Sequence, residues 1–176
     1  MCADQYEPVL DRRSLMLKRT LTAADFESDR TPVENAVFFP PLADQLAHAA
    51  NLVWTELGCG HEESIYRTAL ALALASCGLH SRQEVCVPVM FLGKCVGTGR
   101  ADIIVTGDII LELKTISKLN NQARAQLKAY MCSLEINRGL LINFPSTGGN
   151  LEFVWCELDA GKKHVYWTKP HFLAAK

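Results

Sequence analysis

The sequence lacks several features that would assign it to a class at once. No apolar run is long enough to span a membrane, and the acidic N-terminus has no apolar segment typical of a signal peptide. The formal net charge is −1, which argues against a strongly basic protein that coats DNA but leaves room for a local basic patch. We therefore expect an intracellular protein, cytoplasmic or nuclear, that is neither secreted nor inserted in a membrane.

Cysteine is present, but its spacing matches no familiar metal or redox site. The chain has 7 cysteines, an odd number, and no CxxC pair. Cys59 and His61 are not followed by a second ligand pair at zinc spacing. Only Cys132 and Cys156 lie late in the chain, which argues against a four-cysteine iron–sulfur cluster. We interpret the cysteines as reduced thiols.

The length of 176 residues suits one domain with its own core. Residues 1–42 are charged, weakly periodic and end in FFPPL, and they predict an N-terminal extension. This extension is either a plain tail or a basic arm that contacts phosphates. Residues 43–158 predict the folded domain, and residues 159–176 predict a C-terminal strand and tail.

Hydrophobic periodicity within this domain predicts short strands with helices before and between them. Such an order indicates an α/β (α+β) protein with a sheet flanked by helices. The expected helices are 43–57, 61–77 and 120–135, and the expected strands are 84–92, 101–105, 109–114, 139–144, 151–157 and 163–168.

Two charged residues interrupt the apolar strand ILELK. Glu112 and Lys114 are two positions apart, so both side chains point to the same face. Buried charges are costly unless they are paired or bound to a metal. The alternative interpretation is a surface ion pair on an edge strand.

Asp102 is a lone charge in the preceding apolar strand. A three-residue loop, 106–108, would pair Val105 with Ile109 and place Asp102 opposite Glu112. Two facing carboxylates repel each other, and a divalent cation between them removes that repulsion. Carboxylate oxygens are the ligands that Mg²⁺ and Mn²⁺ prefer, and a nearby lysine can orient or deprotonate a metal-bound water.

Asp102 followed by Glu112-x-Lys114 on adjacent strands resembles the pattern of the PD-(D/E)XK nuclease superfamily. The proline of that name is missing here, because Arg100-Ala101 precedes the aspartate. The resemblance covers residues 43–158 and implies a restriction-endonuclease-like core with a central mixed sheet.

Two further motifs strengthen this resemblance. Gly60-x-x-Glu63-x-x-Tyr66 is similar to the signature of the GxxExxY family within the superfamily. Gln126 and Tyr130, at i and i+4 on one predicted helix face, resemble the Q-x-x-x-Y motif of RecB-like and lambda-exonuclease-like members.

The resemblance implies a metal site and a role for each of its residues. Glu63, Asp102 and Glu112 would ligate Mg²⁺ or Mn²⁺, together with the backbone carbonyl of Leu113. Lys114 would serve the attacking water.

The resemblance also implies substrate contacts. Gln126 would orient the water or a phosphate, Tyr130 would contact the nucleic acid backbone or brace the site, and Arg100 would bind a phosphate. Tyr66 is expected to pack beneath the site.

The function implied is a metal-dependent nuclease with nucleic acid, DNA in particular, as its partner and exonuclease rather than endonuclease action. The alternative is a catalytically inactive nuclease-fold module that binds nucleic acid or a protein partner. A modest basic rim is expected from Lys118, Arg124, Lys128 and Arg100. The oligomeric state is left open.

Overall fold

A computed structural model describes residues 41–105, 109–159 and 165–168 of the chain. The chain divides into two units, residues 1–35 and 36–176, and every described residue belongs to the second unit. None of the described helices is both long and apolar enough to cross a membrane.

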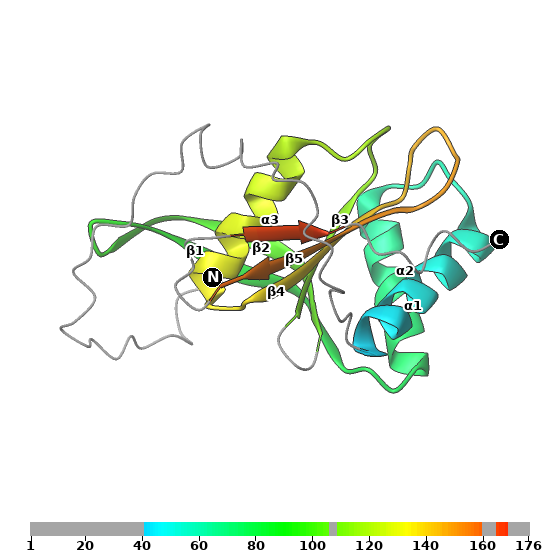
Figure 1. Cartoon of the computed structure of the whole chain (residues 1–176), viewed down its shortest axis with the longest axis horizontal. Coiled ribbons are helices and arrows are strands. Elements are labelled where there is room, and N and C mark those ends of the chain that lie inside the picture. Colours follow the sequence, from blue (N-terminus) through cyan, green and yellow to red (C-terminus); the bar gives the residue numbers. More distant parts are fainter. Residues whose placement is uncertain (1–40, 106–108, 160–164, 169–176) are drawn as a thin grey trace. The chain divides into compact units, whose positions relative to one another are not determined.

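The described residues of the second unit form one mixed sheet of six strands in the order β1-β2-β3-β4-β5-β6 (Figure 1). Strands β3 and β4 are parallel, and α3 connects them, whereas every other neighbouring pair is antiparallel. This arrangement confirms the predicted restriction-endonuclease-like core. The elements are α1 (Pro41–Leu57), α2 (Glu63–Ser76), β1 (Ser81–Phe91), β2 (Lys94–Val105), β3 (Ile109–Lys114), α3 (Asn121–Leu134), β4 (Arg138–Asn143), β5 (Glu152–Leu158) and β6 (Val165–Thr168).

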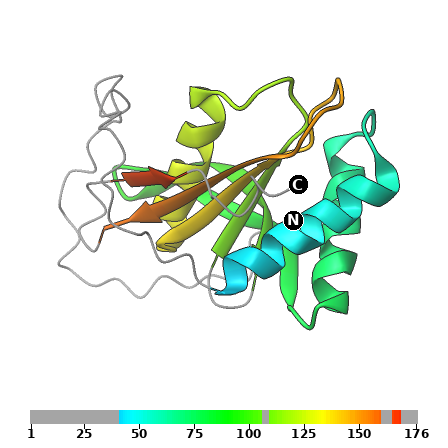
Figure 2. The same cartoon turned by 45° about the vertical axis from the view of Figure 1, so that its right-hand side comes forward.

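Helices cover both faces of the sheet, with α1 and α2 on one face and α3 on the other (Figures 1 and 2). Successive side chains of β3 point to opposite faces of the sheet, so this strand contributes to the hydrophobic core on each face. Ile109, Leu111 and Leu113 pack with the residues of α1 and α2, whereas Ile110 packs with those of α3. Glu112 lies two residues after Ile110, so its side chain points to the same face of the sheet, the one that α3 covers.

Glycines end the first two helices, as the sequence predicts. Gly58, directly after α1, has φ 68°, and Gly78, two residues after the end of α2, has φ 76°. The helix α1 begins at Pro41, two residues earlier than expected, because proline is well suited to a first helical turn. The remainder of the predicted extension, residues 1–40, lies outside the described residues, so its role stays a prediction.

Strand β2 is much longer than the predicted span of 101–105, and that prediction was wrong. It begins at Lys94, directly after the β1–β2 turn, and Gly97 and Gly99 pair with Val89 and Val87 of β1. Glycine weakens a strand because it has no side chain to pack, so this part of β2 has no clear strand pattern in the sequence. The predicted pairing of Val105 with Ile109 is confirmed, while the loop itself, 106–108, lies outside the described residues.

Helix α3 approaches the sheet closely at Gly139 of β4. A Cβ atom at this position would lie 2.9 Å from Leu127 Cδ1 and 2.9 Å from Met131 Sδ, two fully buried side chains of α3. Those atoms have little free space into which to move, because protein cores are close-packed.

We predict that Gly139→Ala lowers the free energy of unfolding by about 1–3 kcal/mol, the usual range for overpacking a core. Urea denaturation followed by circular dichroism measures this loss. Gly97→Ala is the matched control, since a Cβ at Gly97 has no atom within 4 Å. Equal stability of the two variants would contradict the proposed close contact.

Candidate active site

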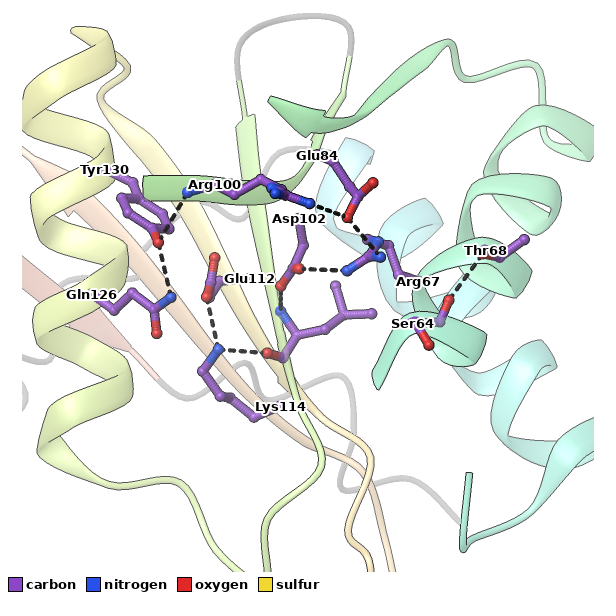
Figure 3. Close-up of polar contacts among 11 residues, drawn as sticks. Ser64, Arg67, Thr68, Glu84, Arg100, Asp102, Glu112, Lys114, Gln126 and Tyr130 are labelled. Atoms are coloured by element: carbon purple, nitrogen blue, oxygen red, sulfur yellow. Dashed lines mark hydrogen bonds and ion pairs between the residues drawn. The ribbon is translucent and has the colours of Figure 1, made fainter. Parts of the chain in front are cut away.

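Glu112 and Lys114 form a buried ion pair in the middle of the sheet. Lys114 Nζ donates to Glu112 Oε1 at 2.7 Å and to the carbonyl oxygen of Leu113 at 2.8 Å (Figure 3). Glu112 is 1% exposed, and β3 lies between β2 and β4. The alternative of a surface ion pair on an edge strand is therefore wrong.

Asp102 lies where β2 and β3 cease to pair. The pairing of β2 with β3 ends at Ile103 and Leu111. The Leu113 N–H therefore has no backbone acceptor on β2. Asp102 Oδ2 accepts this N–H at 2.8 Å, and Oδ1 accepts from Arg67 Nη1 at 3.2 Å. The aspartate thus replaces a missing backbone acceptor, which a buried N–H requires.

The alternation of β2 is interrupted at Asp102. Ala101 and Ile104 both pack in the core beneath α3, although residues three apart in a regular strand face opposite ways. Across the ladder, Glu84 of β1 has φ 52°, a conformation that costs a non-glycine residue about 1–3 kcal/mol. This irregularity lets Asp102 bind Arg67 of α2 on one side while Glu112 lies on its other side (Figure 3).

The Glu112 carboxylate is only half satisfied. Among the described residues, its Oε2 is the one buried side-chain polar atom without a hydrogen-bond partner. Burial raises the pKa of Glu112 to about 7, and the charge of Asp102 adds to this effect, while Lys114 opposes it. An unpaired buried carboxylate oxygen is costly unless a further cation or donor approaches it.

Lys114 keeps its proton in this arrangement. Burial acts to lower its pKa, but the charge and hydrogen bond of Glu112, with the charges of Glu63 and Asp102, outweigh burial and raise it. The ammonium therefore acts as a fixed positive charge among three carboxylates.

Glu63 reaches the same cluster from the first turn of α2. Its pKa is raised by burial, and the charges of Lys114, Asp102 and Arg67 all act on it. Within the described part of the chain, no three His, Cys, Asp or Glu side chains lie close enough to hold a metal by themselves. The ligand set implied by the sequence, including the Leu113 carbonyl, thus stays a prediction.

Gln126 and Tyr130 share a face of α3, as predicted, and Gln126 Nε2 donates to the Tyr130 hydroxyl at 3.0 Å. The same hydroxyl accepts the backbone N–H of Arg100 at 3.3 Å. The tyrosine ring lies against Gly99, where a Cβ would be 2.7 Å from Tyr130 Cε1. The pair therefore fastens α3 to β2 beside the buried carboxylates (Figure 3).

Tyr66 packs beneath the site, as expected. Its ring stacks on Phe144 with centroids 4.5 Å apart. Its hydroxyl donates to the Gly58 carbonyl at 2.7 Å and accepts the His61 N–H at 3.4 Å. The tyrosine thus fixes the turn that leads into Glu63.

Asn143 and Glu152 hold the segment that follows Lys114, and no sequence pattern singles out either residue. Asn143 exchanges hydrogen bonds with both backbone groups of Ile116, at 3.1 and 2.9 Å. Its Nδ2 also donates to Glu152 Oε2 at 3.0 Å, and that oxygen accepts the Leu119 N–H at 2.8 Å.

Sequence reasoning also missed Arg67 and Glu84. Arg67 lies four residues after Glu63, so the helical period already placed the two on one face. Nothing in the sequence marks Glu84, whose position depends on its positive φ. Of the expected basic rim, Lys128 is buried at 5% exposure and does not belong to that rim.

We predict that the metal-free protein loses stability as pH rises from 5 to 8. Between the ordinary pKa of 4.5 and the folded value of about 7, the folded state binds a proton on Glu112 that the unfolded state releases. This stabilisation is complete below pH 4.5 and is lost as pH rises through 7, at no more than about 1.4 kcal/mol per pH unit.

Thermal unfolding in EDTA measures this dependence. Glu112→Gln should flatten it, whereas Glu56→Gln, at an exposed position of α1, should leave it unchanged. An equal pH dependence in all three proteins would contradict the assignment to Glu112.

We predict that Gly99→Ala displaces the Tyr130 ring and breaks its hydrogen bonds to Gln126 and Arg100. The Arg100 amide would then lose its acceptor and exchange with solvent faster, which hydrogen exchange followed by NMR detects. Gly97→Ala on the same strand is the control, and unaltered exchange in Gly99→Ala would contradict the contact.

Comparison with known proteins identifies the family of the chain. A family model described as PD-(D/E)XK nuclease superfamily matches residues 41–153, a span that contains every site residue described above. No curated protein matches the chain. The crystal structure of SSO0001 is similar at 16% identity and a TM-score of 0.38, covering 71% of this chain and 82% of that one. The chain belongs to the PD-(D/E)XK nuclease superfamily.

Proposed function

We propose that this protein hydrolyses phosphodiester bonds of nucleic acid with the help of a divalent metal ion, Mg²⁺ or Mn²⁺. The observation that carries the proposal is the buried Glu112 carboxylate, whose Oε1 is bound by Lys114 and whose Oε2 has no partner. A structural ion pair would need no second, unsatisfied oxygen in this position.

The residues present suit such an ion. The candidate ligands are all oxygens, namely the carboxylates of Glu63, Asp102 and Glu112 and the carbonyl of Leu113, which is the donor type that Mg²⁺ and Mn²⁺ prefer. Burial is the main cause of the raised pKa values of Glu63 and Glu112, and the charges of neighbouring carboxylates add to it. These values are further support, because a bound cation would favour the ionised form of both groups. A bound ion would lower the pKa of its water and neutralise charge on the phosphate.

The other side chains would then bind and orient the substrate. Lys114 is protonated and lies against the Leu113 carbonyl, which suits a role in orienting the attacking water and stabilising charge on phosphorus. Gln126 and Tyr130 are fastened to β2 beside this position and would hold the water or a backbone phosphate. Arg100, 66% exposed in its side chain, would bind a phosphate.

DNA as the substrate and exonuclease action are the finer parts of this proposal. They are supported by the Gln126–Tyr130 pair, whose spacing resembles the motif of exonuclease-type members. The GxxExxY resemblance supports the role of Glu63 in the same way. An inactive nucleic acid or protein-binding module is less well supported, because such modules need no buried Glu112–Lys114 pair.

We predict that the purified protein cleaves end-labelled linear DNA with Mg²⁺ or Mn²⁺ and that EDTA abolishes cleavage. Lys114→Ala and Asp102→Asn should each reduce the rate by about 100-fold or more, the usual contribution of a group that assists proton transfer or charge stabilisation. Gel analysis of labelled products measures the rate.

Lys94→Ala, at an exposed position next to the β1–β2 turn, controls for the loss of a lysine. Circular DNA tests for exonuclease action, which would leave the circles uncut. RNA of matched sequence tests the choice of DNA, because cleaved RNA would contradict a DNA-specific enzyme. Wild-type rates in both Lys114→Ala and Asp102→Asn would overturn the proposed function.

A further inference from the structure

One carboxylate oxygen holds two arginines beside the proposed site. Glu84 Oε1 accepts from Arg67 Nη2 at 3.0 Å and from Arg100 Nη1 at 3.0 Å. The two guanidinium groups come from different elements, α2 and β2, and meet only at this oxygen (Figure 3). Bringing two like charges together requires a negative partner between them.

The position of Glu84 follows from an unfavourable backbone conformation. Its φ of 52° is one that glycine would adopt at no steric cost, yet the chain has a long acidic side chain here. Strained residues persist where the surrounding structure holds them and cluster at binding and catalytic sites. A glutamate at this position is therefore better explained by the charge of its side chain than by its backbone preference.

The Glu84 carboxylate is also placed where an outside group can replace it. Its side chain is 44% exposed and that of Arg100 is 66% exposed, whereas that of Arg67 is 17% exposed and inward. Arg67 uses its other terminal nitrogen to bind Asp102 Oδ1 at 3.2 Å. A chain of ion pairs thus runs from Arg100 at the surface through Glu84 and Arg67 to Asp102, a carboxylate of the proposed site.

We propose that Arg67 and Arg100 form a phosphate-binding subsite and that the Glu84 carboxylate occupies it in the free protein. A nucleic acid phosphate offers several anionic oxygens to two planar guanidinium groups, a match that arginine makes better than lysine. On binding, the phosphate takes the two arginines and Glu84 turns to solvent. This subsite rests on the proposed function for its substrate, but its binding chemistry needs no metal.

The test is binding of a fluorescent ten-nucleotide single-stranded DNA in EDTA at low salt, followed by anisotropy. Glu84→Gln keeps the shape of the side chain and removes its charge, so it should bind about three- to tenfold more tightly than wild type. Glu56→Gln makes the same change in net charge at an exposed position of α1 and should have a much smaller effect. If Glu84→Gln does not fold, Glu84→Gly removes the same charge and also suits the positive φ.

The gain must depend on the two arginines. Arg100→Gln should cancel it in the Glu84→Gln background and lower the slope of log affinity against log salt by about 0.7. Arg82→Gln, which removes an exposed arginine of β1, should leave the gain in place. Affinity in Glu84→Gln that is equal to or below that of Glu56→Gln, or a gain that survives Arg100→Gln, would overturn the proposal.

These outcomes separate the subsite from the nuclease activity. Tighter binding by Glu84→Gln together with no cleavage in Mg²⁺ or Mn²⁺ would leave the subsite standing and overturn the proposed function. Cleavage by the wild type together with unchanged binding by Glu84→Gln would overturn the subsite alone.

Discussion

The buried contact between Glu112 and Lys114 is the constraint on which the rest of the site depends. Two charges in the interior of a sheet lose their hydration, which is costly. Their attraction offsets this cost only when the geometry is good and further hydrogen bonds are present. Here the ammonium has two oxygen acceptors, at 2.7 and 2.8 Å, but the carboxylate keeps one oxygen without a partner. The pair is therefore better explained by chemistry than by stability, and the surrounding residues serve to keep it in place.

The fold supplies that support by letting two strands diverge. Because β2 and β3 cease to pair before Leu113, its N–H has no backbone acceptor on β2. The Asp102 carboxylate accepts this N–H and also binds Arg67, so it links β3 to helix α2. On the opposite face Tyr130 joins α3 to β2 over Gly99. The same divergence thus creates the polar site and fixes the helices that border it.

The sequence predicted the parts of this arrangement that follow from a fixed period. Two-residue alternation placed Glu112 and Lys114 on one face, and a three-residue loop gave the correct pairing of Val105 with Ile109. It failed where the period is broken. The length of β2 was missed because glycines weaken a strand pattern, and the packing of Gly99 against Tyr130 has no sequence signal. Glu84 was missed because a positive φ at a glutamate has no sequence signal either.

A formal charge of −1 is compatible with a polyanionic substrate once the internal pairing of charges is considered. Lys114 is paired with Glu112, Arg100 is paired with Glu84, and Arg67 is paired with both Glu84 and Asp102. Cations held in this way are already ordered, so binding a phosphate exchanges one anion for another and does not immobilise free side chains. Preorganisation of this kind favours affinity without a large net charge. On the proposed function, selectivity for nucleic acid would then come from where the arginines are fixed rather than from how many basic residues the surface has.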